Sequence, residues 1–142
     1  MEIRAATSSD APACAALLAQ LGYPVAEEVV RARIERLSVS AGANVLVAEA
    51  GSKVVAVLAY QLIDSLERER PQCRITTLVT DAATRRRGAA RALVAAVEEI
   101  AVERGCRRLE VTTRPEREEA LAFYTQAGFE ERPRRLVKPL SD

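Results

Sequence analysis

Apolar residues along the chain recur with two spacings, one typical of helices and one typical of strands. Helical spacing predicts four helices, at about 8–21, 26–37, 88–104 and 116–127. Runs rich in valine, alanine and threonine predict five strands, at 1–6, 44–50, 53–62, 73–80 and 108–113. Two shorter strand-like segments follow, at 129–132 and 136–140. Because strands and helices alternate without a linker or repeat, we expect one α/β domain over residues 1–142.

Glycine, proline and charged residues mark the connections between these elements. Gly22 follows the first helical pattern and Gly105 the third, as expected of residues that end helices. Gly51 and Ser52 separate two strands and predict a hairpin. Residues 64–72, DSLERERPQ, are charged and contain proline, which is typical of a loop.

Composition excludes several kinds of chemistry. The 142 residues include 21 Lys+Arg and 20 Asp+Glu, so a net charge of +1 predicts no general attraction to nucleic acid or to a membrane surface. Because histidine is absent, Ser-His-Asp and Cys-His mechanisms are excluded. Cys14, Cys73 and Cys106 are widely spaced, so we expect neither disulfides nor a metal site, and a cytoplasmic protein. No run approaches the ~18 apolar residues of a membrane span.

A basic loop precedes the third predicted helix and is followed by small residues. The arginines are Arg85, Arg86, Arg87 and Arg91, and the small residues are Gly88, Ala89 and Ala90. Free N–H groups at a helix N-terminus bind anions, and small side chains let a phosphate approach them. The loop is either a phosphate site or a solvated basic turn. A nucleic-acid site is disfavoured, since the chain is near neutral and has only three tyrosines and two phenylalanines.

The same segment carries a resemblance to a known superfamily. Arg85-x-x-Gly88-x-Ala90 matches the R/Q-x-x-G-x-G/A signature of the GNAT-type N-acetyltransferases, which bind the pyrophosphate of acetyl-CoA. The chain also resembles that superfamily, in the expected order, at 18–24 (LAQLGYP), 74–81 (RITTLVTD), 107–113 (RRLEVTT), 118–131 (EEALAFYTQAGFEE) and 134–140 (RRLVKPL). The resemblance therefore extends over essentially the whole chain.

This resemblance implies a fold and a cosubstrate site. The fold would be a mixed, mostly antiparallel sheet of six to seven strands with about four helices, in which strands 73–79 and 108–113 splay apart. The pantetheine arm of acetyl-CoA would enter that gap and bind backbone groups of Leu78 and Val79, and the N–H of Leu78 would be the oxyanion donor. The phosphates would bind residues 85–91, and Tyr124 would be the general acid that protonates the CoA sulfur.

The implied activity is transfer of an acetyl group from acetyl-CoA to a primary amine of a small molecule or peptide, which requires neither histidine nor a metal. Thr76 and Thr77 stand where an acidic general base is common in the superfamily. The general base is therefore unassigned. It could be one of four acids, Glu49, Asp64, Glu67 or Glu69, or a base that acts through water, or the amine could arrive already deprotonated. The missing acid also motivates an alternative, a CoA-binding sensor or interaction module without catalysis.

The resemblance also suggests where an acceptor and a second subunit would bind. The corner at 22–24 and the loop at 64–70 would line the acceptor pocket. Members of the superfamily are often homodimers, and the predicted strand 136–140 offers an edge for pairing. The acceptor amine and the acyl-chain preference stay open.

Overall fold

The computed structural model describes residues 1–85, 88–112, 118–132 and 135–141. They form two units, Met1–Thr112 and Thr113–Asp142, which are described separately. Arg86, Arg87 and the first residues of the helix predicted at 116–127 lie outside the described residues. No helix in the described part of the chain is long and apolar enough to cross a membrane.

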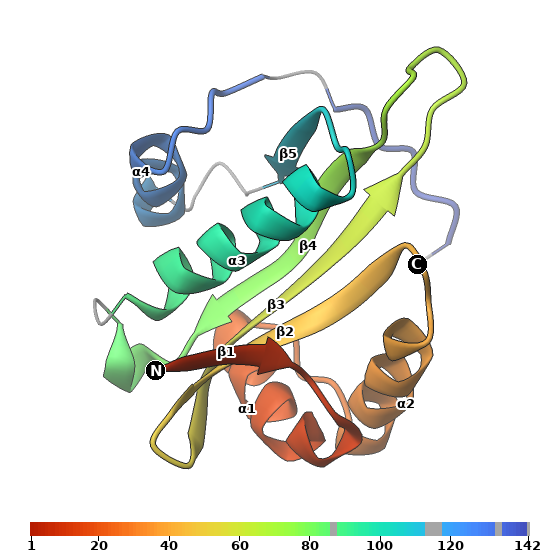
Figure 1. Cartoon of the computed structure of the whole chain (residues 1–142). Coiled ribbons are helices and arrows are strands. Elements are labelled where there is room, and N and C mark those ends of the chain that lie inside the picture. Colours follow the sequence, from red (N-terminus) through yellow and green to blue (C-terminus); the bar gives the residue numbers. More distant parts are fainter. Residues whose placement is uncertain (86–87, 113–117, 133–134, 142) are drawn as a thin grey trace. The chain divides into compact units, whose positions relative to one another are not determined.

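A five-stranded mixed sheet forms the first unit (Figure 1). The strands lie in chain order, as β1 (Glu2–Ala5), β2 (Ala43–Ala50), β3 (Lys53–Ile63), β4 (Gln72–Thr80) and β5 (Arg108–Val111). The first three pairings are antiparallel, and β4 pairs with β5 in parallel. The predicted mostly antiparallel sheet is thus confirmed.

Helices cover both faces of this sheet (Figure 1). The helices α1 (Ala11–Leu21) and α2 (Glu27–Ser38) lie on one face, and α3 (Ala89–Glu103) lies on the other. Short 3-10 turns, η1 (Ser8–Asp10) and η2 (Ala82–Thr84), precede α1 and α3. The predicted spacing is confirmed in α1, where Cys14 and Leu17 are buried and Gly22 ends the helix at a φ of 100°. The helices bury apolar residues on both faces of the sheet, and this packing stabilises it.

One core cluster joins α1 and α2 to the sheet. Cys14 and Leu17 of α1 and Val30 and Ile34 of α2 are in the same buried cluster as four strand valines, Val45, Val47, Val57 and Val79. Cys73 is also buried, and Cys106 is half-buried. Burial raises the pKa of the Cys14 and Cys73 thiols to about 11, so both are protonated at neutral pH. These two cysteines therefore act as small core residues.

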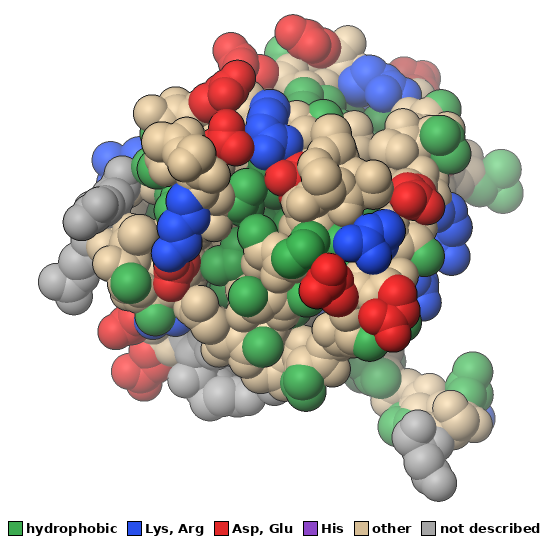
Figure 2. Space-filling model, turned by 90° about the horizontal axis from the view of Figure 1, so that it is seen from below, with side chains coloured by type: hydrophobic (Ala, Val, Ile, Leu, Met, Phe, Trp, Pro, Cys, Tyr) green, Lys and Arg blue, Asp and Glu red, His purple; other side chains and the backbone are tan. Residues whose placement is uncertain are grey.

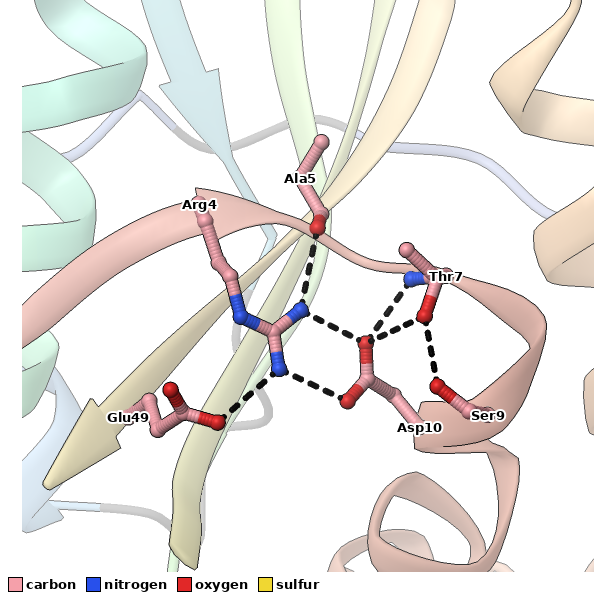
Figure 3. Close-up of polar contacts among 6 residues, drawn as sticks. All are labelled: Arg4, Ala5, Thr7, Ser9, Asp10 and Glu49. Atoms are coloured by element: carbon pink, nitrogen blue, oxygen red, sulfur yellow. Dashed lines mark hydrogen bonds and ion pairs between the residues drawn. The ribbon is translucent and has the colours of Figure 1, made fainter. Parts of the chain in front are cut away.

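Arg4 links β1 to the start of α1 and to β2 (Figure 3). Its guanidinium binds both carboxylate oxygens of Asp10, with Nη1–Oδ2 and Nη2–Oδ1 distances of 2.8 and 2.9 Å, and its Nη2 lies 3.1 Å from Glu49 Oε2. Asp10 is buried and also accepts the backbone N–H of Thr7 at 2.8 Å. Since the charged carboxylate receives these bonds, the pKa of Asp10 lies below its usual value.

The second unit contains α4 (Glu118–Gln126), and the two tail strands predicted at 129–132 and 136–140 are wrong. Residues 129–132 and 135–141 have neither helical nor strand structure. Leu136 and Leu140 are 95% and 91% exposed, so no apolar face is buried to stabilise a strand, and Pro139 cannot donate to a ladder. The described sheet therefore has five strands instead of six to seven, and the predicted pairing edge for a homodimer is absent from it.

Candidate functional site

A β-bulge lies in the middle of β4. Ala59 of β3 faces Thr77 and the next residue, Tyr60, faces Ile75, so Thr76 is the extra residue. Its hydroxyl donates to the Ala59 carbonyl at 3.3 Å. A bulge reverses the inward and outward alternation of a strand. Ile75 pairs with Tyr60 before the bulge, whereas after it Val79 pairs with Val57 and lies in the core beneath α1 and α2.

Beyond the bulge, one edge of β4 is open with respect to the described residues, which pair with no strand there. Parallel pairing to β5 covers four residue pairs, from Gln72 with Arg108 to Ile75 with Val111. The last five residues of β4, from Thr76 to Thr80, have no β5 partner among the described pairings. The described pairing of these two strands therefore ends at Ile75 and Val111.

The ladder to β3 determines which backbone groups face this open edge. The Asp81 N–H donates to the Val55 carbonyl at 2.8 Å, and alternate residues of an antiparallel strand bond to the same neighbour. The backbone N–H and C=O groups of Thr77 and Val79 therefore face β3, while those of Leu78 and Thr80 face away from it. The predicted backbone donor Leu78 is available, but the groups of Val79 are used in the ladder. The groups of Thr80, which was not selected from the sequence, face the same way as those of Leu78.

The N-terminus of α3 follows β4 in the chain and has features of an anion site. Gly88 is the N-cap, with a φ of 85°, and no side chain caps the helix there. The first intrahelical bond runs from the Ala92 N–H to the Gly88 carbonyl at 2.9 Å, so the N–H groups of residues 89–91 have no acceptor within the helix. The first turn contains no acidic residue. A Cβ built on Gly88 meets no atom within 4 Å, so the backbone is open to a ligand.

Two predicted arginines can be located in this segment. Arg85, at the C-cap of η2, is exposed, and Arg91, in the first turn of α3, is also exposed. Both add positive charge near the free N–H groups, and guanidinium groups bind phosphate oxygens well. The structure thus brings together the uncapped helix end, two of the four arginines and the small residues Gly88, Ala89 and Ala90.

Tyr124 lies in the second unit, on α4. Its side chain is 8% exposed and makes edge-to-face contacts with two other rings, Phe123 at 5.3 Å and Phe129 at 5.4 Å between centroids. Such contacts fix the orientation of the ring. The role of Tyr124 as general acid stays a prediction.

Several acidic side chains of the first unit lie against arginines. Glu49, one of the candidate bases, binds Arg4, and Glu67 lies 4.0 Å from Arg68. Glu110 on β5 was not selected from the sequence; its carboxylate is bound by Arg74 at 2.6 Å and by Arg108 at 3.2 Å.

Two shallow hollows lie in the first unit, each of about 340 Å³. One is lined by Glu67, Arg68, Glu69, Arg70 and Arg107, so the loop predicted to line an acceptor pocket does border a hollow of mixed charge. The other lies between the end of α2 and the end of β3 and reaches the bulge residue Thr76. On the face shown in Figure 2, acidic and basic side chains are interspersed, and no basic patch for a polyanion is seen there.

Comparison with known proteins identifies close structural relatives. Residues 11–129 match the sequence model of the acetyltransferase (GNAT) family. A transcriptional regulator from Bacillus halodurans C-125 is 28% identical with a TM-score of 0.87, the match covering 98% of this chain and 99% of the other. A putative acetyltransferase from Agrobacterium tumefaciens C58 is 25% identical over the same shares, also with a TM-score of 0.87.

An aminoglycoside N-acetyltransferase solved in complex with CoA shares the fold, with 21% identity, a TM-score of 0.86 and coverage of 97% of this chain and 93% of the other. Among curated proteins, none matches the sequence significantly.

Proposed function

Since the chain belongs to the acetyltransferase (GNAT) family, we propose that it transfers an acetyl group from acetyl-CoA to a primary amine of a small molecule or peptide by direct attack. The observation that carries this proposal is the open edge of β4, where the N–H groups of Leu78 and Thr80 face away from β3. That edge leads directly to the uncapped N-terminus of α3. An extended arm along a strand edge and a pyrophosphate at a helix end are the two contacts that acetyl-CoA requires.

The residues around α3 suit the phosphates of this cosubstrate. The N–H groups of residues 89–91 lack helical acceptors, and Gly88 leaves their approach open. Arg85 and Arg91 supply charge, and the sequence places Arg86 and Arg87 beside them. Acetyl-CoA supplies the acetyl group as a thioester, which is already activated for attack by an amine.

Two groups of the chain then act on the reaction. The Leu78 N–H donates to the carbonyl oxygen as it becomes negative, a contribution worth about 10²–10³ in kcat for one such donor. As the carbon–sulfur bond breaks, the Tyr124 hydroxyl donates its proton to the sulfur. A phenol with a pKa near ~10 is protonated at neutral pH, and general acid catalysis contributes about 10²–10⁴.

The amine loses its protons without a dedicated carboxylate. β4 carries threonines at the bulge, and Glu49 and Glu110 are bound by arginines. We infer that the amine reacts in its neutral form and loses one proton to water while the other stays on the amide nitrogen. Water then returns a proton to Tyr124, which replaces the one given to the sulfur. Below the pKa of the amine, kcat/KM then rises about tenfold per pH unit, and the profile moves with the amine when amines of different pKa are compared.

The acceptor is expected to be a small molecule. Two aminoglycoside acetyltransferases share the fold, one of them solved with sisomicin. The loop hollow at 67–70 combines two acids with arginines, which suits an acceptor with hydroxyl and amine groups better than a strongly anionic polymer.

A second candidate is an acyl-CoA sensor without turnover. Two observations favour it: no acid lies on β4, and the Bacillus halodurans relative is called a transcriptional regulator. Both candidates require acetyl-CoA to bind, and only the first requires release of free CoA.

The test has two steps. Acetyl-CoA at 100 times its Kd should stabilise the fold by about 2.7 kcal/mol, and CoA release should follow on addition of amines that include aminoglycosides and short peptides. Arg85→Glu should weaken binding, while Arg33→Glu, an exposed position on α2, serves as the control. Absence of stabilisation contradicts both candidates, and stabilisation without CoA release from any amine favours the sensor.

A further inference from the structure

A hydrogen-bonded clamp connects α1 to the loop between β4 and α3. Gln20, in the last turn of α1, accepts the Ala82 N–H at its Oε1 (2.8 Å) and donates from its Nε2 to Asp81 Oδ1 (3.2 Å). These partners are more than sixty positions away in the sequence. One side-chain amide therefore holds two successive residues of the loop, once as acceptor and once as donor.

Asp81 is the centre of this clamp. It is 8% exposed, and its Oδ1 also accepts the Ala83 N–H at 3.2 Å, while its backbone carbonyl accepts the Thr84 hydroxyl at 3.2 Å. Lys53 Nζ lies 3.4 Å from Oδ2. The Ala83 and Gln20 hydrogen bonds lower the pKa of Asp81, so it is ionised at neutral pH. The clamp therefore keeps the negative Asp81 carboxylate bound to donors of the protein, next to the site proposed to bind phosphates.

The clamp lies between the two parts of the proposed acetyl-CoA site, the edge of β4 and the N-terminus of α3. Thr80, whose backbone faces the open edge of β4, immediately precedes Asp81, and the η2 turn (Ala82–Thr84) leads to the α3 N-terminus. Gln20 thus holds the first two residues of the segment that connects the two ends of the proposed acetyl-CoA site. A ligand that spans both ends binds best when their spacing is fixed in advance, because less ordering is needed on binding.

We propose that Gln20 is a positioning residue for acetyl-CoA, which sets the spacing between the pantetheine edge at Leu78 and Thr80 and the pyrophosphate site at the start of α3. This inference rests on the proposed function. Glutamine is required because its amide offers an acceptor to Ala82 and a donor to Asp81. Glutamate would place a second carboxylate against Asp81, and methionine, of similar length, would make neither bond.

The test compares two acyl donors. Acetyl-pantetheine reaches only the β4 edge, whereas acetyl-CoA spans both sites. Gln20→Met should lower kcat/KM with acetyl-CoA five- to tenfold, mainly through KM, and change kcat/KM with acetyl-pantetheine by less than twofold. Gln20→Glu should reduce acetyl-CoA use further. Lys53→Met is the control: it removes another side-chain contact of the Asp81 carboxylate, but the lysine side chain is 71% exposed, so little change is expected.

The outcomes separate this inference from the proposed function. Equal losses with both donors, or a Gln20→Met variant that binds acetyl-CoA as the wild type does, would show that Gln20 only stabilises the fold. Gln20 lies at an exposed position near a helix end, so the variants should fold, and thermal unfolding of each checks this. If the wild type bound no acetyl-CoA at all, the proposed function would fail and this inference with it.

Discussion

Gly88 and Gly105 lie at opposite ends of α3, and both have a positive φ. Alanine substitutions at the two positions therefore separate an effect on stability from an effect on acetyl-CoA binding. Their φ angles are 85° and 74°, and a Cβ built at either position meets no atom within 4 Å. The cost of alanine is therefore conformational alone. The left-handed region costs a non-glycine residue about 1–2 kcal/mol, and the stiffer unfolded chain offsets about 0.4–1 kcal/mol of this.

The two variants should lose about 1 kcal/mol each, which corresponds to a fall in Tm of roughly 3–4 °C for a chain of this size. Only Gly88→Ala should also weaken acetyl-CoA binding, because its methyl group would occupy the approach to the free N–H groups of α3. Loss of one hydrogen bond to a charged group is worth about 1.5–3 kcal/mol, which corresponds to an increase in Kd of about 10- to 100-fold.

Thermal unfolding measures the change in Tm, and calorimetric titration with acetyl-CoA measures the change in Kd. Gly105 ends α3 with its N–H bonded to the Val102 carbonyl at 3.1 Å, so it reproduces the strain of Gly88 away from the proposed site. If both variants lose the same stability but bind acetyl-CoA as tightly as the wild type, the α3 N-terminus is not the phosphate site. A Gly105→Ala variant that binds as weakly as Gly88→Ala would contradict the reasoning equally.

Two further predictions concern Asp10 and Tyr124. The pKa of Asp10 is lowered in the folded state by Arg4, so its stabilising effect is present above the unfolded pKa, 3.8, and is lost as the pH falls through the folded value. Urea unfolding should show the wild type losing stability below about pH 4 more steeply than Asp10→Asn, and parallel curves would exclude this linkage. Tyr124→Phe should lower kcat about 10²–10⁴-fold with little change in acetyl-CoA affinity, and an unchanged kcat in steady-state assays would remove Tyr124 from the mechanism.

Local patterns predicted most of the fold. The periodicity of apolar residues placed the second helix at 26–37, and the structure has α2 at Glu27–Ser38. Gly51 and Ser52 do connect two paired strands. The tail at 129–140 contains the same residue types as a strand, but strands need a buried face, and the sequence does not reveal that Leu136 and Leu140 remain exposed.

The site was only partly predictable, because several of its features depend on contacts between distant segments. Arg85 and Gly88 are only three positions apart in the chain and could be recognised together. The bulge at Thr76 arises from the register with β3, which no local pattern specifies. For the same reason, local patterns could not show that the backbone groups of Thr80, and not those of Val79, face away from β3. Gln20 is one polar residue near the end of an apolar helix, and only its bonds to Ala82 and Asp81 give it a role.

The open edge of β4 is the central element of this account, and amide chemical shifts test it most directly. Titration of ¹⁵N-labelled protein with acetyl-CoA should shift the N–H signals of Leu78, Thr80 and residues 89–91, whereas Thr77 and Val79, bonded to β3, should move much less. Shifts concentrated elsewhere, with Leu78 and Thr80 unchanged at saturation, would contradict the proposed cosubstrate site.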